Sequence, residues 1–171
     1  RMIRTSSAIT WPGQPGYVAP PELKPLTADQ KKLYHAGKDR YTATCAPCHQ
    51  PHGLGQEGLA PPLAGSEWAQ GSEQRVIRIV LNGLRGPVAV RGQTIDLAMP
   101  GLAILDDDQI AALLTYVRRE WDNAGDTVSI TTVKEIRDAT ATRQDAWTVA
   151  DQENRKGNPP HGGGQNDRAV V

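Results

Sequence analysis

Cys45-Ala46-Pro47-Cys48-His49 is the stretch of sequence that decides the fold. It is a C-x-x-C-H motif, which is typical of covalent attachment of a c-type haem. Two thiols at this spacing near a helix end can both reach the vinyl groups on one edge of a porphyrin. The adjoining histidine is then delivered to the iron without the entropy cost of binding a free ligand. The motif therefore predicts thioether bonds from Cys45 and Cys48 and an iron ligand in His49.

Two other kinds of site also use closely spaced cysteines. A thioredoxin-type redox pair expects a βαβ context, which this chain does not show. A zinc site would have to draw on Cys45, Cys48, His49 and His52, which crowd into eight residues without the loop that usually separates pairs of zinc ligands. Haem attachment is favoured over both.

The composition excludes several classes of protein. A chain of 171 residues is the size of one domain with an appended segment. Lys plus Arg equals Asp plus Glu at 19 each, so the basic surplus that attracts nucleic acid is missing. Two cysteines cannot form a disulfide framework, and no apolar run is long enough to predict a membrane span. The first eleven residues lack the features of a secretory signal, which suggests a mature form or an excised piece.

The chain has little bulky apolar material for a core. It contains no Phe, four Trp and four Tyr, against 17 Gly and 13 Pro. Such a composition predicts many turns and a small core. A buried porphyrin would supply the large flat apolar body that is otherwise lacking, so the haem-free chain is predicted not to fold.

Hydrophobic periodicity and capping residues predict the helices. Thr27 and Gln30 form a capping box that opens a helix reaching about Thr44. Asp106 and Gln109 form another, which opens a helix ending near Trp121. Three weaker helical segments follow the same logic: residues 72–83, residues 129–139 and a last turn at Thr148.

The remaining segments are read from turn-forming residues. Residues 86–100 carry alternating valines and a glycine turn, which predict a short hairpin. Residues 1–26 hold five prolines and predict an extended arm or linker. Residues 122–153 form a C-terminal extension, and residues 154–171 are predicted to be disordered because they have nothing to bury.

A six-coordinate haem needs a second iron ligand from another part of the chain. Met2 lies in the arm and His161 in the tail, and His52 follows His49 too closely to cross to the other face. His35 lies on the helix that leads into Cys45, so the chain would have to reverse direction for His35 to reach the other face of the haem.

Met99 is the favoured second ligand. It lies 54 residues after Cys45, on a turn before Pro100, and this spacing lets the chain wrap around the haem.

Four segments together resemble the class I c-type cytochromes: residues 37–49, 60–65, 98–100 and 106–119. The resemblance covers residues 27–121 and implies an all-α fold, with three to four main helices around one covalently bound haem c. It implies that the first and last helices cross where Gly37 and Tyr41 meet Tyr116. It also implies that the Pro61 carbonyl accepts the Nδ1 proton of His49 and fixes its ring.

Shorter motifs at residues 11–16, 65–68, 78–83 and 118–121 resemble the C-terminal cytochrome region of bacterial propeller-type membrane-bound dehydrogenases of the quinoprotein type. The resemblance implies residence in the periplasm or elsewhere outside the cytoplasm. It also implies redox partners: a dehydrogenase as donor and a cytochrome or oxidase as acceptor.

His and Met on opposite faces would leave no open position on the iron, which predicts one-electron transfer rather than catalysis. An alternative function is a haem subunit or docking module of a larger respiratory complex. Arg78, Arg85 and Arg91 flank the segment that leads to Met99, and Arg85 is the favoured partner of a haem propionate. Trp68 is a candidate for a wall of the haem pocket.

Overall fold

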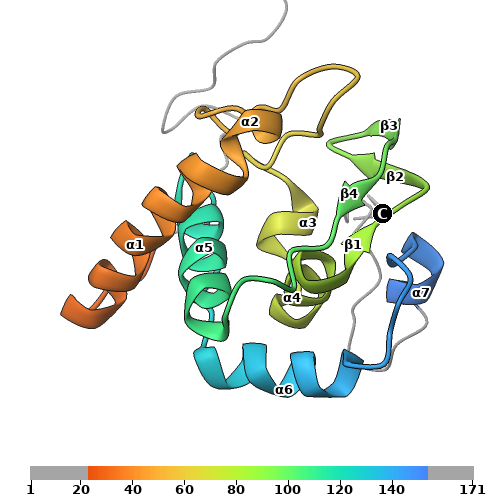
Figure 1. Ribbon diagram of the computed structural model, residues 1–171. Coiled ribbons are helices and arrows are strands. Elements are labelled where there is room, and N and C mark those ends of the chain that lie inside the picture. The colour runs from red at the N-terminus through yellow and green to blue at the C-terminus, as the bar shows by residue number, and fades with distance from the viewer. Residues whose placement is uncertain (1–22, 154–171) are drawn as a thin grey trace, which may run out of the picture.

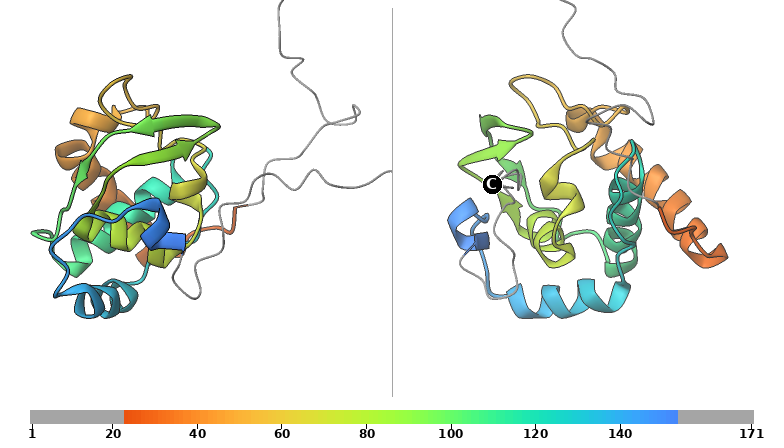
Figure 2. Two further views of the ribbon diagram at one scale, coloured as in Figure 1. Left: turned by 90° about the vertical axis from the view of Figure 1, so that its right-hand side faces the viewer. Right: turned by 180° about the vertical axis from the view of Figure 1, so that it is seen from behind.

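The computed structural model describes residues 23–153 as a helical body with a small β region on one side (Figures 1 and 2). Met2 and His161, most of the predicted arm and the predicted disordered tail lie outside the described residues. The helices are α1 (Ala28–Thr44), α2 (Ala46–His49), α3 (Glu67–Gln70), α4 (Glu73–Asn82), α5 (Asp107–Arg119), α6 (Ile130–Thr140) and α7 (Val149–Glu153). The strands are β1 (Gly83–Leu84), β2 (Pro87–Val90), β3 (Gln93–Asp96) and β4 (Met99–Pro100).

The predicted caps begin the two long helices. Thr27 and Gln30 exchange side-chain and backbone hydrogen bonds at the start of α1, and Asp106 and Gln109 do the same for α5. Each capping box satisfies backbone N–H groups that have no partner within the helix. Single serine hydroxyls cap α4, through Ser72, and α6, through Ser129. The main helices therefore begin where local side-chain chemistry places them.

Helices α1 and α5 cross at a glycine (Figure 1). A Cβ on Gly37 would lie 2.0 Å from the carbonyl oxygen of Ala112, so only glycine allows this approach. The rings of Tyr41 and Tyr116 pack beside the contact with their centroids 5.3 Å apart. The predicted crossing of the first and last cytochrome helices is confirmed.

The predicted extension packs against the predicted haem unit and shares its core. Helix α6 runs beneath α4 and α5 (Figure 1), and Val128, Val133 and Ile136 join the main hydrophobic cluster. After α6 the chain turns back, and α7 lies beside the β region (Figure 2). The polar stretch after Trp121 is therefore held to the body by its few apolar residues.

The β region consists of two antiparallel pairs. Strands β2 and β3 form the predicted hairpin, and its two-residue turn is Arg91-Gly92. Both turn residues have positive φ, the geometry of a tight turn that matches strand twist. Strand β1 pairs with β4, so that Leu84 lies opposite Met99.

Two features differ from the sequence-based expectation. Helix α3 was not predicted, because a single helical turn is too short to show a hydrophobic period. The described residues hold seven helices and two small sheets, more elements than the expected three to four main helices. Within residues 23–153, no helix combines the length and apolarity needed to cross a bilayer.

Candidate haem site

The motif lies where α1 gives way to the short helix α2. Cys45 ends α1 with its N–H bonded to the carbonyl of Tyr41, and the His49 N–H donates to the Cys45 carbonyl at 2.8 Å. The Cys45 thiol is buried and that of Cys48 is exposed. One turn of helix therefore presents two thiols and an imidazole on a single short segment.

The environment of Cys45 does not suit a redox-active thiolate. Burial, and secondarily the neighbouring Cys48 thiol, raises the pKa of the Cys45 thiol to about 12. Nucleophilic and metal-binding cysteines need a lowered pKa, because the thiolate is the reactive form. The buried thiol is suited to a permanent bond rather than to repeated redox exchange.

The structure also gives no support to a zinc site. His52 is exposed, and its Nδ1 accepts a hydrogen bond from the Leu54 N–H at 3.2 Å. Across residues 23–153, no three His, Cys, Asp or Glu side chains gather into a metal-binding group.

His49 is held with one ring nitrogen engaged. Its side chain is buried, and Nδ1 donates to the carbonyl oxygen of Pro61 at 2.9 Å. Burial lowers the pKa of His49, and the bond to Pro61 partly opposes that shift. The imidazole is therefore neutral, and with the proton on Nδ1 its Nε2 lone pair is the one that can bind a metal.

One cavity brings the motif and Met99 together. It has a volume of about 160 Å³, and Cys45, Cys48, His49 and Met99 all line it. His35 and His52 do not line it. The rest of its wall is almost wholly apolar and comes from the loop after α2 and from α3, α4, α5 and the strands, including Leu63, Ala69, Val76, Ile79, Val80, Leu84, Val88, Val90, Ile95, Leu113, Leu114 and Val117.

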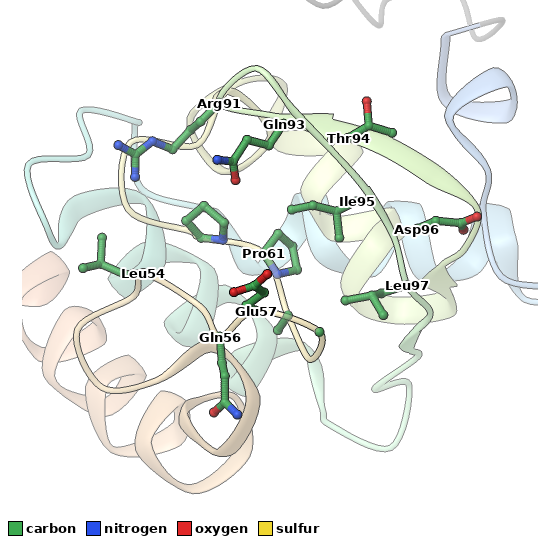
Figure 3. A pocket seen from close by; sticks show the side chains of 13 residues that line it. Leu54, Gln56, Glu57, Pro61, Arg91, Gln93, Thr94, Ile95, Asp96 and Leu97 are labelled. Atoms are coloured by element: carbon green, nitrogen blue, oxygen red, sulfur yellow. The ribbon is translucent and has the colours of Figure 1, made fainter.

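A second, more polar hollow adjoins this cavity (Figure 3). We call it the outer cleft; its volume is about 840 Å³. The two hollows share the wall formed by Ala60, Pro61, Pro62, Ile95 and Leu97. Glu57 lies on the loop side of the outer cleft, and Arg91 and Gln93 lie on the hairpin side.

The two aromatic and basic candidates differ in their placement. Trp68 lines the apolar cavity, is 7% exposed and donates from Nε1 to the Ala89 carbonyl at 2.8 Å. Arg85 is exposed and lines neither hollow, whereas Arg91 lines the outer cleft. Sequence reasoning missed Arg75, whose guanidinium lies 4.7 Å from the centre of the Trp68 ring.

These donors and walls fit a haem. Two thiols, an imidazole and a thioether line one cavity, and its apolar walls suit a macrocycle. The polar outer cleft suits the two carboxylates of a porphyrin, and its volume is within the roughly 300–1,000 Å³ of small-molecule sites.

Comparison with known proteins points in the same direction. The cytochrome c family model matches residues 34–121. Cytochrome c-552 of Thermus thermophilus is 36% identical over 101 residues, which cover 57% of this chain and 71% of that protein.

Longer relatives match more of this chain. The cytochrome c subunit of the quinone alcohol dehydrogenase of Gluconacetobacter polyoxogenes is 29% identical over 133 residues, 76% of this chain. The fructose dehydrogenase cytochrome subunit of Gluconobacter japonicus is 32% identical over 109 residues, 59% of this chain. The chain spans 28% and 22% of the lengths of these two relatives.

Proposed function

This chain belongs to the cytochrome c family, whose members bind haem c covalently, and on that premise we propose that it carries single electrons on one haem from a quinoprotein-type dehydrogenase to a downstream acceptor. The observation that carries the proposal is the apolar cavity, lined jointly by the C-x-x-C-H motif and by Met99.

Each residue of the site has a role in this proposal. Cys45 and Cys48 hold the macrocycle, and His49 and Met99 bind the iron from its two faces. Pro61 fixes the His49 ring through the hydrogen bond at Nδ1. Trp68 and the aliphatic side chains keep water from the cavity. When bound, haem supplies an iron that changes its charge by one electron, and thioether ligation and burial favour its reduced state.

The proposed partner of a haem propionate is Arg91. Sequence reasoning favoured Arg85, but Arg85 lines neither hollow and Arg91 lines the outer cleft. A cation at this position would offset the charge of a propionate and favour ferrous haem. The backbone of Arg91 is itself fixed, because its N–H donates to both carboxylate oxygens of Glu67, at 3.0 and 3.1 Å.

The relatives support a dehydrogenase as the electron donor. Two of them are named as cytochrome subunits of alcohol and fructose dehydrogenases. By analogy, this chain would work outside the cytoplasm, as a haem unit at residues 27–121 with an extension at residues 122–153. The same names favour a second candidate function, a haem subunit inside a larger respiratory assembly.

The test is the spectrum of the purified holoprotein. We expect one covalent haem per chain, a low-spin ferric form with a thioether-to-iron charge-transfer band, and no binding of carbon monoxide by the ferrous form at neutral pH. Met99→His should abolish the band. Met2→Leu is the matched control, since Met2 and Met99 are the two methionines of the chain, and it should keep the band. Absence of the band in the parent protein, or its survival in Met99→His, would refute the assignment of Met99.

A further inference from the structure

The extension returns to the strand that carries Met99. The family match ends at residue 121, but the structure continues through α6 and then brings Trp147 against β1. Figure 1 shows this return path, with α6 crossing beneath the body and α7 rising beside β1 and β4.

Trp147 extends the β1–β4 pair to a third segment. Its N–H donates to the Gly83 carbonyl at 3.0 Å, and its carbonyl accepts from the Arg85 N–H at 2.8 Å. These two bonds form a parallel bridge to Leu84, and Leu84 lies opposite Met99 in the antiparallel pair. Trp147, Leu84 and Met99 therefore lie side by side on adjacent segments.

The pair that holds Met99 needs such support. Strands β1 and β4 contain two residues each. Even a complete two-stranded hairpin is marginally stable in water, and a third strand or a packed face is needed for stability. The contact with Trp147 supplies the third segment, since it adds two backbone hydrogen bonds on the edge of β1 that β4 does not use.

Trp147 is itself firmly anchored. The residue is 1% exposed, and its Nε1 donates to Asn82 Oδ1 at 3.3 Å at the end of α4. The guanidinium of Arg143 lies 3.5 Å from the centre of the ring and is paired with Asp151 at 2.8 Å.

The next helix is anchored to the same region. Gln152 on α7 accepts a hydrogen bond from the buried Arg78 of α4 at 3.1 Å. Val149 packs into the hydrophobic cluster that Met99 also touches. The segment around Trp147 is thus held to α4 and to the hydrophobic cluster that lines part of the cavity.

We propose that Trp147 is a positioning residue for the Met99 ligand, and that the extension limits how often the Met99 strand opens and releases the iron. The inference rests on the proposed function, in which Met99 binds the haem iron. Local opening of a short segment has its own free energy, separate from global unfolding, and can be altered selectively. The route from Trp147 to Met99 is the backbone bridge to Leu84, which lies opposite Met99.

The experiment measures displacement of the thioether by imidazole in the ferric holoprotein. Imidazole binds only after Met99 leaves the iron, so its apparent affinity reports the opening equilibrium, and loss of the thioether-to-iron band is the readout. Trp147→Ala should bind imidazole at least tenfold more tightly than the parent. Both variants keep the backbone N–H and C=O of residue 147, but Trp147→Phe also keeps a buried apolar ring and should stay within about threefold of the parent.

Val133→Ala is the matched control. Val133 is a fully buried residue of the same extension and packs in the main cluster, away from the Trp147 contact. Urea added to this variant can equalise its global stability with that of Trp147→Ala. At equal stability, tighter imidazole binding by Trp147→Ala alone supports the inference, and equal binding overturns it.

Two further outcomes keep the test decisive. If Trp147→Ala does not accumulate, Arg143→Gln removes the guanidinium from the ring and should shift imidazole affinity in the same direction by a smaller factor; no shift overturns the inference. If the parent protein lacks the thioether band, Met99 is not the ligand, and the proposed assignment fails together with the inference. A parent with the band and variants without a shift defeat the inference alone.

Discussion

Arg91 and Arg85 lie close in sequence but differ in their position relative to the outer cleft. The two residues flank strand β2, but only Arg91 lines the outer cleft. Arg91→Gln should lower the reduction potential of the haem, because it removes a positive charge that favours the ferrous form. Arg85→Gln is the matched control and should leave the potential close to that of the parent. Potentiometric titration measures both potentials. A larger drop in Arg85→Gln than in Arg91→Gln would mean that Arg85 is the partner of the propionate.

Tyr116 makes the stability of the protein sensitive to alkaline pH. Burial, and secondarily the charge of Glu120, raises the pKa of Tyr116 to about 12, against about 10 in the unfolded chain. Between these values the unfolded chain loses the phenol proton and the native chain keeps it, so the free energy of unfolding falls as pH rises. Below pH 10 the contribution is fully present.

The slope expected for one such group between pH 10 and 12 is at most about 1.4 kcal/mol per pH unit, and solvent screening makes it smaller. Tyr116→Phe should remove about that much of the slope, and Tyr34 and Tyr41, whose pKa values burial also raises, should retain theirs. Urea unfolding at a series of pH values measures it. A slope in Tyr116→Phe equal to that of the parent would contradict the assignment.

At the scale of elements, the crossing of α1 and α5 depends on the missing side chain of Gly37. Alanine has the better helix propensity by roughly 1 kcal/mol. Its Cβ, however, would lie 2.0 Å from the Ala112 carbonyl oxygen and 2.9 Å from the Tyr116 Cβ, so the two helices would have to move apart. Such overpacking costs roughly 1–3 kcal/mol and sometimes more, and at this separation it outweighs the propensity.

Gly37→Ala should therefore lower the free energy of unfolding by about 2 kcal/mol net. The exposed neighbour Ala36 provides the control, since Ala36→Gly should cost about 1 kcal/mol through propensity alone. Urea denaturation of both holoproteins measures the difference. A Gly37→Ala variant more stable than the parent would show that the helices separate at little cost.

The helices and the hairpin that could be predicted are those whose sequence signals lie within a few neighbouring residues. Capping boxes at Thr27 and Asp106 and an alternating stretch with a glycine turn are complete within a few residues, and the structure has the corresponding helices and hairpin. Helix α3 and the Trp147 contact were missed. A single turn has no period to detect, and the pairing of Trp147 with Leu84 joins residues 63 positions apart that share no local pattern.

In the candidate site, too, the residues with a local sequence signal were predicted and the others were not. Cys45, Cys48, His49 and Met99 were predicted as haem ligands from their spacing, and all four line one cavity. Which of Arg85 and Arg91 lies beside the outer cleft depends on how the β2–β3 hairpin folds over it, and the spacing of residues in the sequence does not show this. Arg75 was missed because its contact with Trp68 needs the fold of α3 against α4.

At the scale of the whole molecule, the core is arranged around the cavity. One hydrophobic cluster comes mainly from α1, α4, α5 and α6, a second consists of Trp68, Ile79, Val88 and Val90 from α3, α4 and β2, and Met99 packs against both. The side chains that line the cavity come from nearly every element of residues 45–117. A single group placed there would contact most of the fold at once.

From this arrangement we expect the haem to be required for folding. Without the haem, the apolar side chains that line the cavity would face water, which is unfavourable, and the contacts and ligand bonds of the haem would be lost as well. Natural domains have only about 5–15 kcal/mol in total, and a chain without Phe has little to collapse into the space. Cys45→Ala/Cys48→Ala prepared without haem should therefore show no cooperative thermal transition, whereas the parent holoprotein should melt in one. Circular dichroism distinguishes them, and a native-like spectrum with a cooperative melt in the haem-free variant would mean that the helices close the cavity without the cofactor.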